Sequence, residues 1–238
     1  MKQDHARGPL ARRSFLSRLA AGAGAFGAAF TAAGTAEAQQ APASAGPFQP
    51  ARHAEDDWFD QTTAKHRFFY DTVTTDGFAQ ALFFARNYFV ANASGYKLTD
   101  ADLAQVICLR HASTSFAFTD AMWAKYSAAL SERGDKFLDP KTKQVPTTNL
   151  MRVGGYGELM RNVNVTIDQM AQRGVRFAVC AMATRATANL AAQKSGGNAD
   201  AIFKELTENL IPNAHMVPAG IVAVNRAQER GYSFAYVT

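Results

Sequence analysis

The sequence is poor in cysteine and histidine, and this excludes several kinds of site. Its 238 residues include two cysteines, Cys108 and Cys180, and five histidines. Two cysteines exclude a disulfide-rich scaffold. A single bridge between them would need a geometry that residues in or beside central strands rarely meet. The four histidines after residue 38 show no metal-ligand spacing, so we expect no metal site.

The chain also has little excess of positive over negative charge. The formal net charge is +5, but residues 1–38 hold five basic and two acidic residues, and the remaining 20 basic and 18 acidic residues nearly balance. No basic stripe is interleaved with aromatic residues, which argues against a nucleic-acid partner. Residues 154–157 are glycine-rich but follow no strand and lack the dinucleotide-binding spacing. We therefore expect no cofactor, since a flavin or similar group has no supporting motif.

Residues 1–38 have the pattern of a twin-arginine export signal. Arg12 and Arg13 precede a weakly hydrophobic stretch rich in alanine and glycine, and Ala36 to Ala38 match a small-x-small cleavage site. The alternative is an amphipathic or disordered N-terminal arm. The pattern predicts an exported, periplasmic protein with no membrane attachment after cleavage. Residues 39–64 are expected to form a linker and an N-terminal arm, and residues 65–238 the folded domain.

Apolar runs alternate with helical patterns throughout residues 65–238. This alternation predicts a three-layer α/β/α fold with a mainly parallel five-stranded sheet. The expected strands are residues 66–73, 103–110, 175–179, 215–217 and 232–237, and the expected helices are residues 78–93, 118–130, 155–173, 181–194, 200–210 and 218–231. Residues 131–154 have no clear period. A loop of this length is typical of a functional lid or of a disordered segment.

Three stretches of the chain resemble the DsrE/DsrF-like family of small α/β sulfur-relay proteins, in particular an exported branch of it. They are residues 109–126, 173–180 and 217–229. In characterised members a cysteine after a central strand carries sulfur as a persulfide. Cys180 matches that position, and Ala183 and Arg185 are close to the family's pattern. The resemblance implies homo- or hetero-oligomers, with a sulfur donor or acceptor protein as partner.

Cys180 is the candidate nucleophile, since it is expected where a buried strand gives way to a helix. In an open α/β sheet this edge is where ligands bind. A helix N-terminus also favours the thiolate form, which is the attacking species. The alternative is that Cys180 is a small buried hydrophobic residue, as free cysteines often are. We interpret Cys108, which lies within a strand, as part of the core.

Four further residues are candidates for the same site. His111 ends the second strand and is a candidate base for Cys180, or else a loop histidine that caps the next helix or bonds to Asp120. Arg185 is expected to add positive potential near the thiol. Asn225 and Arg226 are candidate binding residues, or else part of a solvated helix face.

Two functions remain open from the sequence. One is an exported DsrE-like protein that binds or relays sulfane sulfur through Cys180, and is at most a sulfur carrier or transferase. The other is a non-catalytic periplasmic module that binds a small molecule or a protein on the same fold.

Overall fold

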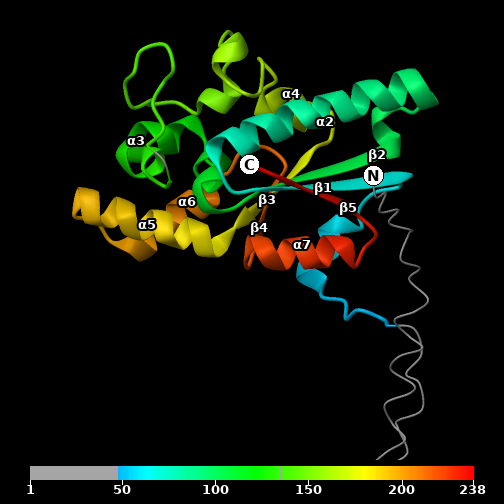
Figure 1. Ribbon diagram of the computed structural model, residues 1–238. Helices are drawn as coiled ribbons and strands as arrows, with labels where there is room; N and C mark the ends of the chain where they lie inside the picture. Colours follow the sequence, from blue (N-terminus) through cyan, green and yellow to red (C-terminus); the bar gives the residue numbers. More distant parts are fainter. Residues whose placement is uncertain (1–47, 135) are drawn as a thin grey trace, which may run out of the picture. The chain divides into compact units, whose positions relative to one another are not determined.

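The computed structural model describes residues 48–134 and 136–238, and its folded unit is Pro50–Thr238. The expected export signal lies outside the described residues. The unit contains one five-stranded sheet in which every pairing is parallel (Figure 1). The strands are β1 (His66–Thr72), β2 (Leu103–Leu109), β3 (Arg176–Cys180), β4 (Ala214–Val217) and β5 (Ser233–Val237). The predicted α/β/α architecture is confirmed.

The strand order, β4-β3-β2-β1-β5, explains which helices cover which face. The chain steps from β1 to β4 in one direction, and right-handed crossovers place every helix of these steps on one face. They are α2 (Thr75–Tyr96), α3 (Asp120–Ser131), α4 (Ile167–Gln172), α5 (Ala181–Ser195) and α6 (Ala199–Glu208). The last crossover runs back from β4 to β5. Its helix, α7 (Gly220–Gln228), therefore lies on the opposite face.

Two hydrophobic cores reflect this division. The larger core packs Phe78 and Leu82 of α2 against Ile107 and Phe177 of the sheet. The smaller core lies on the α7 face and is completed by the 3-10 helix η1 (Ala54–Phe59), which buries Trp58 and Phe59. Part of the segment predicted as a linker and arm is thus an element of the fold. Among the described residues, no helix has both the length and the apolar character needed to cross a membrane.

Strand β2 is buried along its whole length, as expected for a central strand covered on both faces. Its one polar side chain, Gln105, accepts a hydrogen bond from Tyr70 Oη (3.0 Å) and donates one to the Ala85 carbonyl (3.2 Å). A buried amide without these partners would destabilise the sheet.

One predicted helix, residues 155–173, is mostly wrong. Within that range the structure has only α4 and the 3-10 turn Gly157–Leu159. The Asn164 side chain accepts hydrogen bonds from the backbone N–H groups of Gly155 and Gly157, and Val163 and Asn164 both adopt positive φ. These local bonds compete with helical ones. A helix forms only after Thr166, whose hydroxyl caps α4 by accepting from the Gln169 N–H.

Candidate functional site

A cavity of about 1250 Å³ opens at the carboxyl edge of the sheet. Residues that follow β1 and β2 line it, together with Tyr236 of β5. The crossovers leave β1 toward one face and reach β5 from the other, so the cavity lies at the topological switch point where open α/β sheets bind ligands. We call this cavity the carboxyl-edge pocket.

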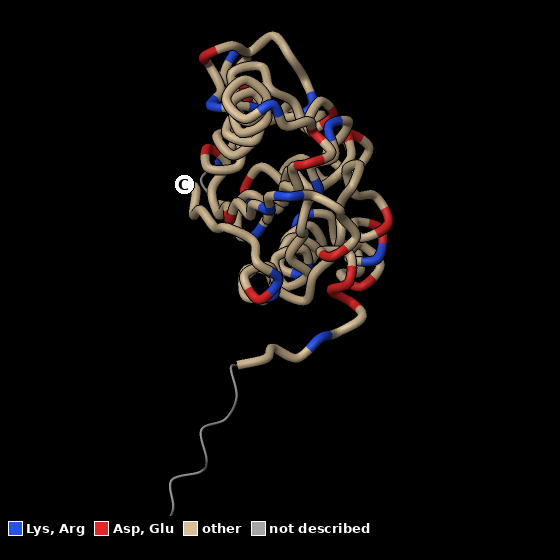
Figure 2. The backbone as a smooth tube through the Cα atoms, turned by 90° about the vertical axis from the view of Figure 1, so that its right-hand side faces the viewer, with Lys and Arg blue, Asp and Glu red and all other residues tan. Residues whose placement is uncertain are grey.

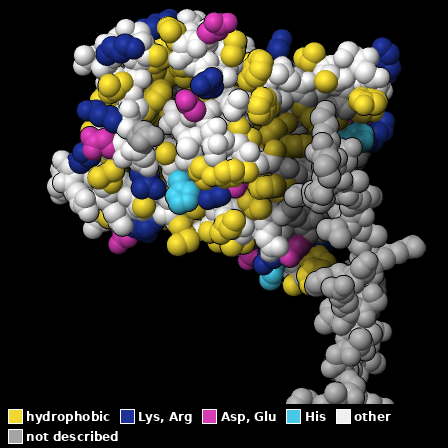
Figure 3. Space-filling view, viewed as in Figure 1, with side chains coloured by type: hydrophobic (Ala, Val, Ile, Leu, Met, Phe, Trp, Pro, Cys, Tyr) yellow, Lys and Arg dark blue, Asp and Glu magenta, His cyan; other side chains and the backbone are white. Residues whose placement is uncertain are grey.

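Basic side chains outnumber acidic ones in the carboxyl-edge pocket. Its charged and titratable lining residues are Arg110, His111, Arg133, Lys136, Lys143 and Arg161 on the basic side and Asp76 and Asp139 on the acidic side. Apolar surface lies between them, from Phe137, Leu138 and Tyr236 among others. In Figure 3 basic side chains gather over the α3 side of the visible face. Elsewhere basic and acidic residues are intermixed along the chain (Figure 2).

A buried ion pair supports one side of the pocket. Arg110 donates to both carboxylate oxygens of Asp71 through Nε and Nη2, each at 2.7 Å, and Asp71 is 2% exposed. Its hydrogen bonds to Asp71 raise the pKa of Arg110. The pair links the ends of β1 and β2. Gly220, the first residue of α7, packs so tightly here that a Cβ would lie 2.6 Å from Arg110 Cδ. Only glycine fits this contact.

Residues 131–154 were predicted as a lid or a disordered loop, and several of the described residues of this segment form a wall of the pocket. Phe137 packs edge-on against Phe116, with ring centroids 5.1 Å apart, and its N–H donates to the Ser131 carbonyl. Asp139 accepts a hydrogen bond from Tyr156 Oη at 2.9 Å and is held by backbone N–H groups, which lower its pKa against the effect of burial. The wall is therefore tied to the domain at several points.

His111 lies in the pocket, as an exposed residue directly after β2 and Arg110. Its backbone has a φ of 55°, in the left-handed region that few non-glycine residues adopt. The next residue, Ala112, donates its N–H to the Val73 carbonyl at 3.0 Å, which holds this conformation. Strained backbone of this kind clusters at ligand sites.

Cys180 lies at the junction of β3 and α5, as the sequence predicts, but it does not line the pocket. It is 6% exposed, and its Sγ caps α5 by accepting a hydrogen bond from the Ala183 N–H at 3.4 Å. Cys108 is fully buried, and burial raises the pKa of its thiol. Both cysteines are free thiols.

Arg133 lines the pocket, and sequence reasoning missed it. Burial lowers the pKa of its guanidinium, and the charge of the Cys180 thiolate would oppose that shift. Its Nε is buried without a hydrogen-bond partner in the described part of the chain. The one feature of the sequence that could have pointed to Arg133 is the charged Ser-Glu-Arg-Gly motif at the start of residues 131–154.

The other three predicted site residues lie elsewhere. Arg185 forms an ion pair with Asp200 at 2.6 Å and stacks over Phe203 of α6, 4.0 Å from the ring centroid. Arg226 pairs with Asp56 at 3.4 Å and with Glu229 at 3.1 Å, and it also donates to Asn225. None of the three lines the carboxyl-edge pocket.

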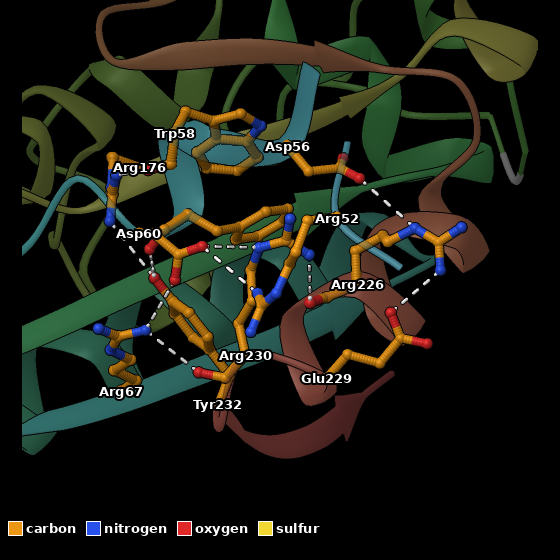
Figure 4. A network of polar contacts seen from close by, with 11 residues as sticks. Arg52, Asp56, Trp58, Asp60, Arg67, Arg176, Arg226, Glu229, Arg230 and Tyr232 are labelled. Atoms are coloured by element: carbon orange, nitrogen blue, oxygen red, sulfur yellow. Dashed lines mark hydrogen bonds and ion pairs between the residues drawn. The ribbon is translucent and has the colours of Figure 1, made fainter. Parts of the chain in front are cut away.

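Arg226 belongs to a set of arginines that holds η1 on the sheet, which we call the arginine clamp (Figure 4). Its members are Arg52, Arg67, Arg176, Arg226 and Arg230. Asp60 alone accepts from three of them, at 3.5, 3.1 and 3.0 Å. Arg176 donates to the Trp58 carbonyl. The clamp attaches η1 to β1, β3 and α7.

No group of three or more potential metal ligands is found among the residues that the structure describes. Comparisons with protein-family models, with curated proteins and with solved structures find no match to this chain.

Proposed function

We propose that this chain is an exported protein that binds a small organic anion in the carboxyl-edge pocket. The observation that carries the proposal is the excess of basic over acidic side chains in a cavity at the switch point of the sheet. Ligand sites commonly have volumes of roughly 300–1,000 Å³, so a pocket of about 1250 Å³ has room for a metabolite-sized molecule. Phe137, Leu138 and Tyr236 favour a ligand with an apolar or aromatic body beside its acidic group.

The anion would meet three basic side chains that have no carboxylate within ion-pair distance among the described residues. They are Arg133, Lys136 and Lys143. The Asp71 carboxylate holds Arg110 in place, which removes the entropic cost of ordering that side chain on binding. Preorganised positive charge is the main requirement for recognising carboxylates, sulfonates and phosphates.

The test is a fluorescence titration with 8-anilinonaphthalene-1-sulfonate, an aromatic sulfonate that matches the mixed lining. We expect saturable binding that weakens as ionic strength rises, because salt screens exposed charges. The variant Lys136→Gln/Lys143→Gln should raise Kd about tenfold, equivalent to ~1.4 kcal/mol. The matched control Lys97→Gln/Lys204→Gln removes two lysines outside the pocket and should leave Kd unchanged. Equal loss of affinity in both variants would refute the site.

A second candidate function, sulfur carriage by Cys180 in the manner of the DsrE/DsrF-like proteins, is favoured by one observation. The Cys180 sulfur caps α5 by accepting a hydrogen bond from the Ala183 N–H, which places the thiol at the positive end of that helix. In this proposal the Cys180 thiolate attacks the outer sulfur of a persulfide donor. A bond forms between Cys180 Sγ and that outer sulfur, and the S–S bond of the donor breaks. Cys180 becomes a persulfide and the donor leaves as its thiolate, so no external oxidant is needed.

Mass spectrometry after incubation with glutathione persulfide tests sulfur carriage. The proposal requires an adduct of about 32 Da, one sulfur atom, on native protein but not on Cys180→Ala. The variant Arg133→Gln should slow adduct formation. An adduct that persists in Cys180→Ala, or forms only after unfolding, rules out sulfur carriage and leaves anion binding untouched.

A further inference from the structure

The edge strand β5 is unusually exposed for a parallel sheet. It pairs with β1 on one side, and among the described residues no strand pairs with its other side. Three of its five residues are exposed, whereas every residue of β2 is buried. Unpaired N–H and C=O groups along such an edge form a template for another strand.

The side chains of β5 favour strand pairing. The strand reads Ser-Phe-Ala-Tyr-Val and contains no charged residue, no proline and no glycine, the residues by which natural edges discourage pairing. Phe234 is 40% exposed and Tyr236 is 55% exposed. They lie beside Phe69 and Asp71 in the β1 register, which places both aromatic rings on the α7 side of the sheet.

Aromatic residues also flank this edge on the α2 side. Gln80 of α2 lines the same pocket as Tyr236, and Phe84, one helical turn later, is exposed. The rings of Phe68 and Tyr88 lie near each other, with centroids 5.4 Å apart. Figure 3 shows hydrophobic side chains gathered between α2 and α7, over the β1 and β5 side of the sheet. Exposed aromatic residues gathered beside an unpaired strand are typical of an interface.

We propose that β5 pairs in an antiparallel manner with β5 of a second copy of this chain, which joins two five-stranded sheets about a two-fold axis. The strand is complementary to itself under that symmetry. A register centred on Ala235 places Phe234 opposite Tyr236 of the second copy and repeats the contact on the other side of the axis. Cross-strand aromatic pairs stabilise antiparallel sheets, and a two-fold interface closes without further growth.

A second copy is the occupant that β5 fits, because the strand matches Phe234 with Tyr236 when it pairs with itself and brings no like charges together. The inference does not depend on the proposed function, since a monomer would keep the basic lining of the carboxyl-edge pocket. The two are connected only through Tyr236, which lies both at the edge and in the pocket. Pairing would cover part of this pocket wall.

Sedimentation equilibrium of the full chain between 5 and 100 µM tests the interface. We expect a mass twice the 25.7 kDa of one chain. The variants Phe234→Lys and Tyr236→Lys should yield monomers with an unchanged far-ultraviolet circular dichroism spectrum. The matched control Tyr96→Lys replaces an aromatic residue that is 75% exposed at the far end of α2 and should remain dimeric.

A monomer at 100 µM would overturn the proposal, as would a dimer that survives both lysine substitutions. If a lysine variant fails to fold, hydrogen exchange of the unmodified protein tests whether a second copy covers β5. The amides of residues 233–237 should exchange more slowly at 100 µM than at 5 µM. Exchange that does not depend on concentration contradicts the inference, including the case in which another segment of the same chain covers β5.

Discussion

The arginine clamp and the carboxyl-edge pocket both concentrate positive charge, but only in the clamp does every arginine have a partner within the described chain. Each clamp arginine has an acidic or carbonyl partner within the chain, and Asp60 serves three of them. In the pocket, Arg110 has a partner in Asp71, whereas Arg133, Lys136 and Lys143 have no ion-pair partner among the described residues. The paired arginines of the clamp stabilise the fold, whereas the unpaired cations of the pocket are available to a ligand.

This comparison predicts opposite phenotypes for the two regions. Variants in the clamp should lower the free energy of unfolding and leave anion affinity unchanged. Variants of the unpaired pocket cations should lower anion affinity and leave stability unchanged. The four predictions that follow test this separation, beginning with the largest effect.

The largest effect is expected where η1 meets the sheet. Phe59 is fully buried between Trp58, Phe69 and Tyr232, with ring centroids 3.9, 6.3 and 5.7 Å away. Phe59→Ala should lower the free energy of unfolding by about 4 kcal/mol, because it leaves a cavity that the core cannot fill. Urea denaturation measures the loss. At 10 °C, where the variant remains folded, its Kd for the sulfonate probe should match that of the parent. A higher Kd would show that the η1 region contributes to anion binding and would contradict the separation of the two regions.

The second prediction concerns Arg110, which loses its ion-pair partner when Asp71 is replaced by asparagine. Asp71→Asn weakens the buried pair with Arg110 and should lower the free energy of unfolding by about 3 kcal/mol. The same change releases positive charge at the pocket, so the sulfonate probe should bind about threefold more tightly. In the double variant Asp71→Asn/Arg110→Gln the gain should disappear. If Asp71→Asn binds the probe no better, the Asp71 carboxylate does not weaken anion binding at this edge of the sheet.

Arg226 provides the third prediction, since the sequence alone made it a candidate binding residue. Arg226→Ala removes ion pairs with Asp56 and Glu229 on a partly exposed surface, and should cost about 1 kcal/mol of stability. Its probe affinity should equal that of the parent. Asn225→Ala, which keeps both ion pairs, is the matched control and should change neither quantity. Loss of probe binding in Arg226→Ala would return this residue to the binding site.

The smallest effect is a pH dependence of stability. His215 stacks on Trp58, with centroids 4.4 Å apart, and its pKa is lowered by burial and by the Arg176 charge. The unfolded chain binds this proton at a pKa near 6.5. Its stabilising contribution is therefore present above pH about 6.5 and is lost as the pH falls below it. Thermal midpoints between pH 7.5 and 5.5 should fall less in His215→Gln than in His66→Gln; equal slopes would exclude His215 as the cause.

The sequence predicted the sheet well because its strands are local apolar runs. Residues 103–110 were expected to form a strand covered on both faces, and β2 is buried from Leu103 to Leu109. The expected helix over residues 155–173 failed because Asn164 binds two glycine N–H groups, a contact between loop residues that periodicity does not reveal. The strand order depends on which face each crossover takes, and local sequence patterns do not encode that choice.

The candidate site was only partly predictable. Sequence order places Cys180 and His111 at strand ends, and the structure has them there. Whether a side chain is exposed to the pocket depends on packing between distant segments. Arg133 reaches the pocket from a loop with no regular period, and Arg185 turns toward Asp200 because α6 packs beside α5. Sequence spacing along a single helix cannot predict such contacts. The roles assigned to Cys180 and His111 stay predictions.

The position of β5 beside β1 also has a kinetic consequence. These strands lie near opposite ends of the described chain, and the hydrogen bond from Arg67 to the Arg230 carbonyl spans 163 residues. Closing so long a loop is entropically costly and slows folding. Strands β1 to β4 are neighbours in sequence order and can pair first. Until β5 pairs with β1, β1 is therefore an exposed edge strand. The slowest step of folding should therefore be the docking of β5, during which β1 is the strand most open to pairing with another chain.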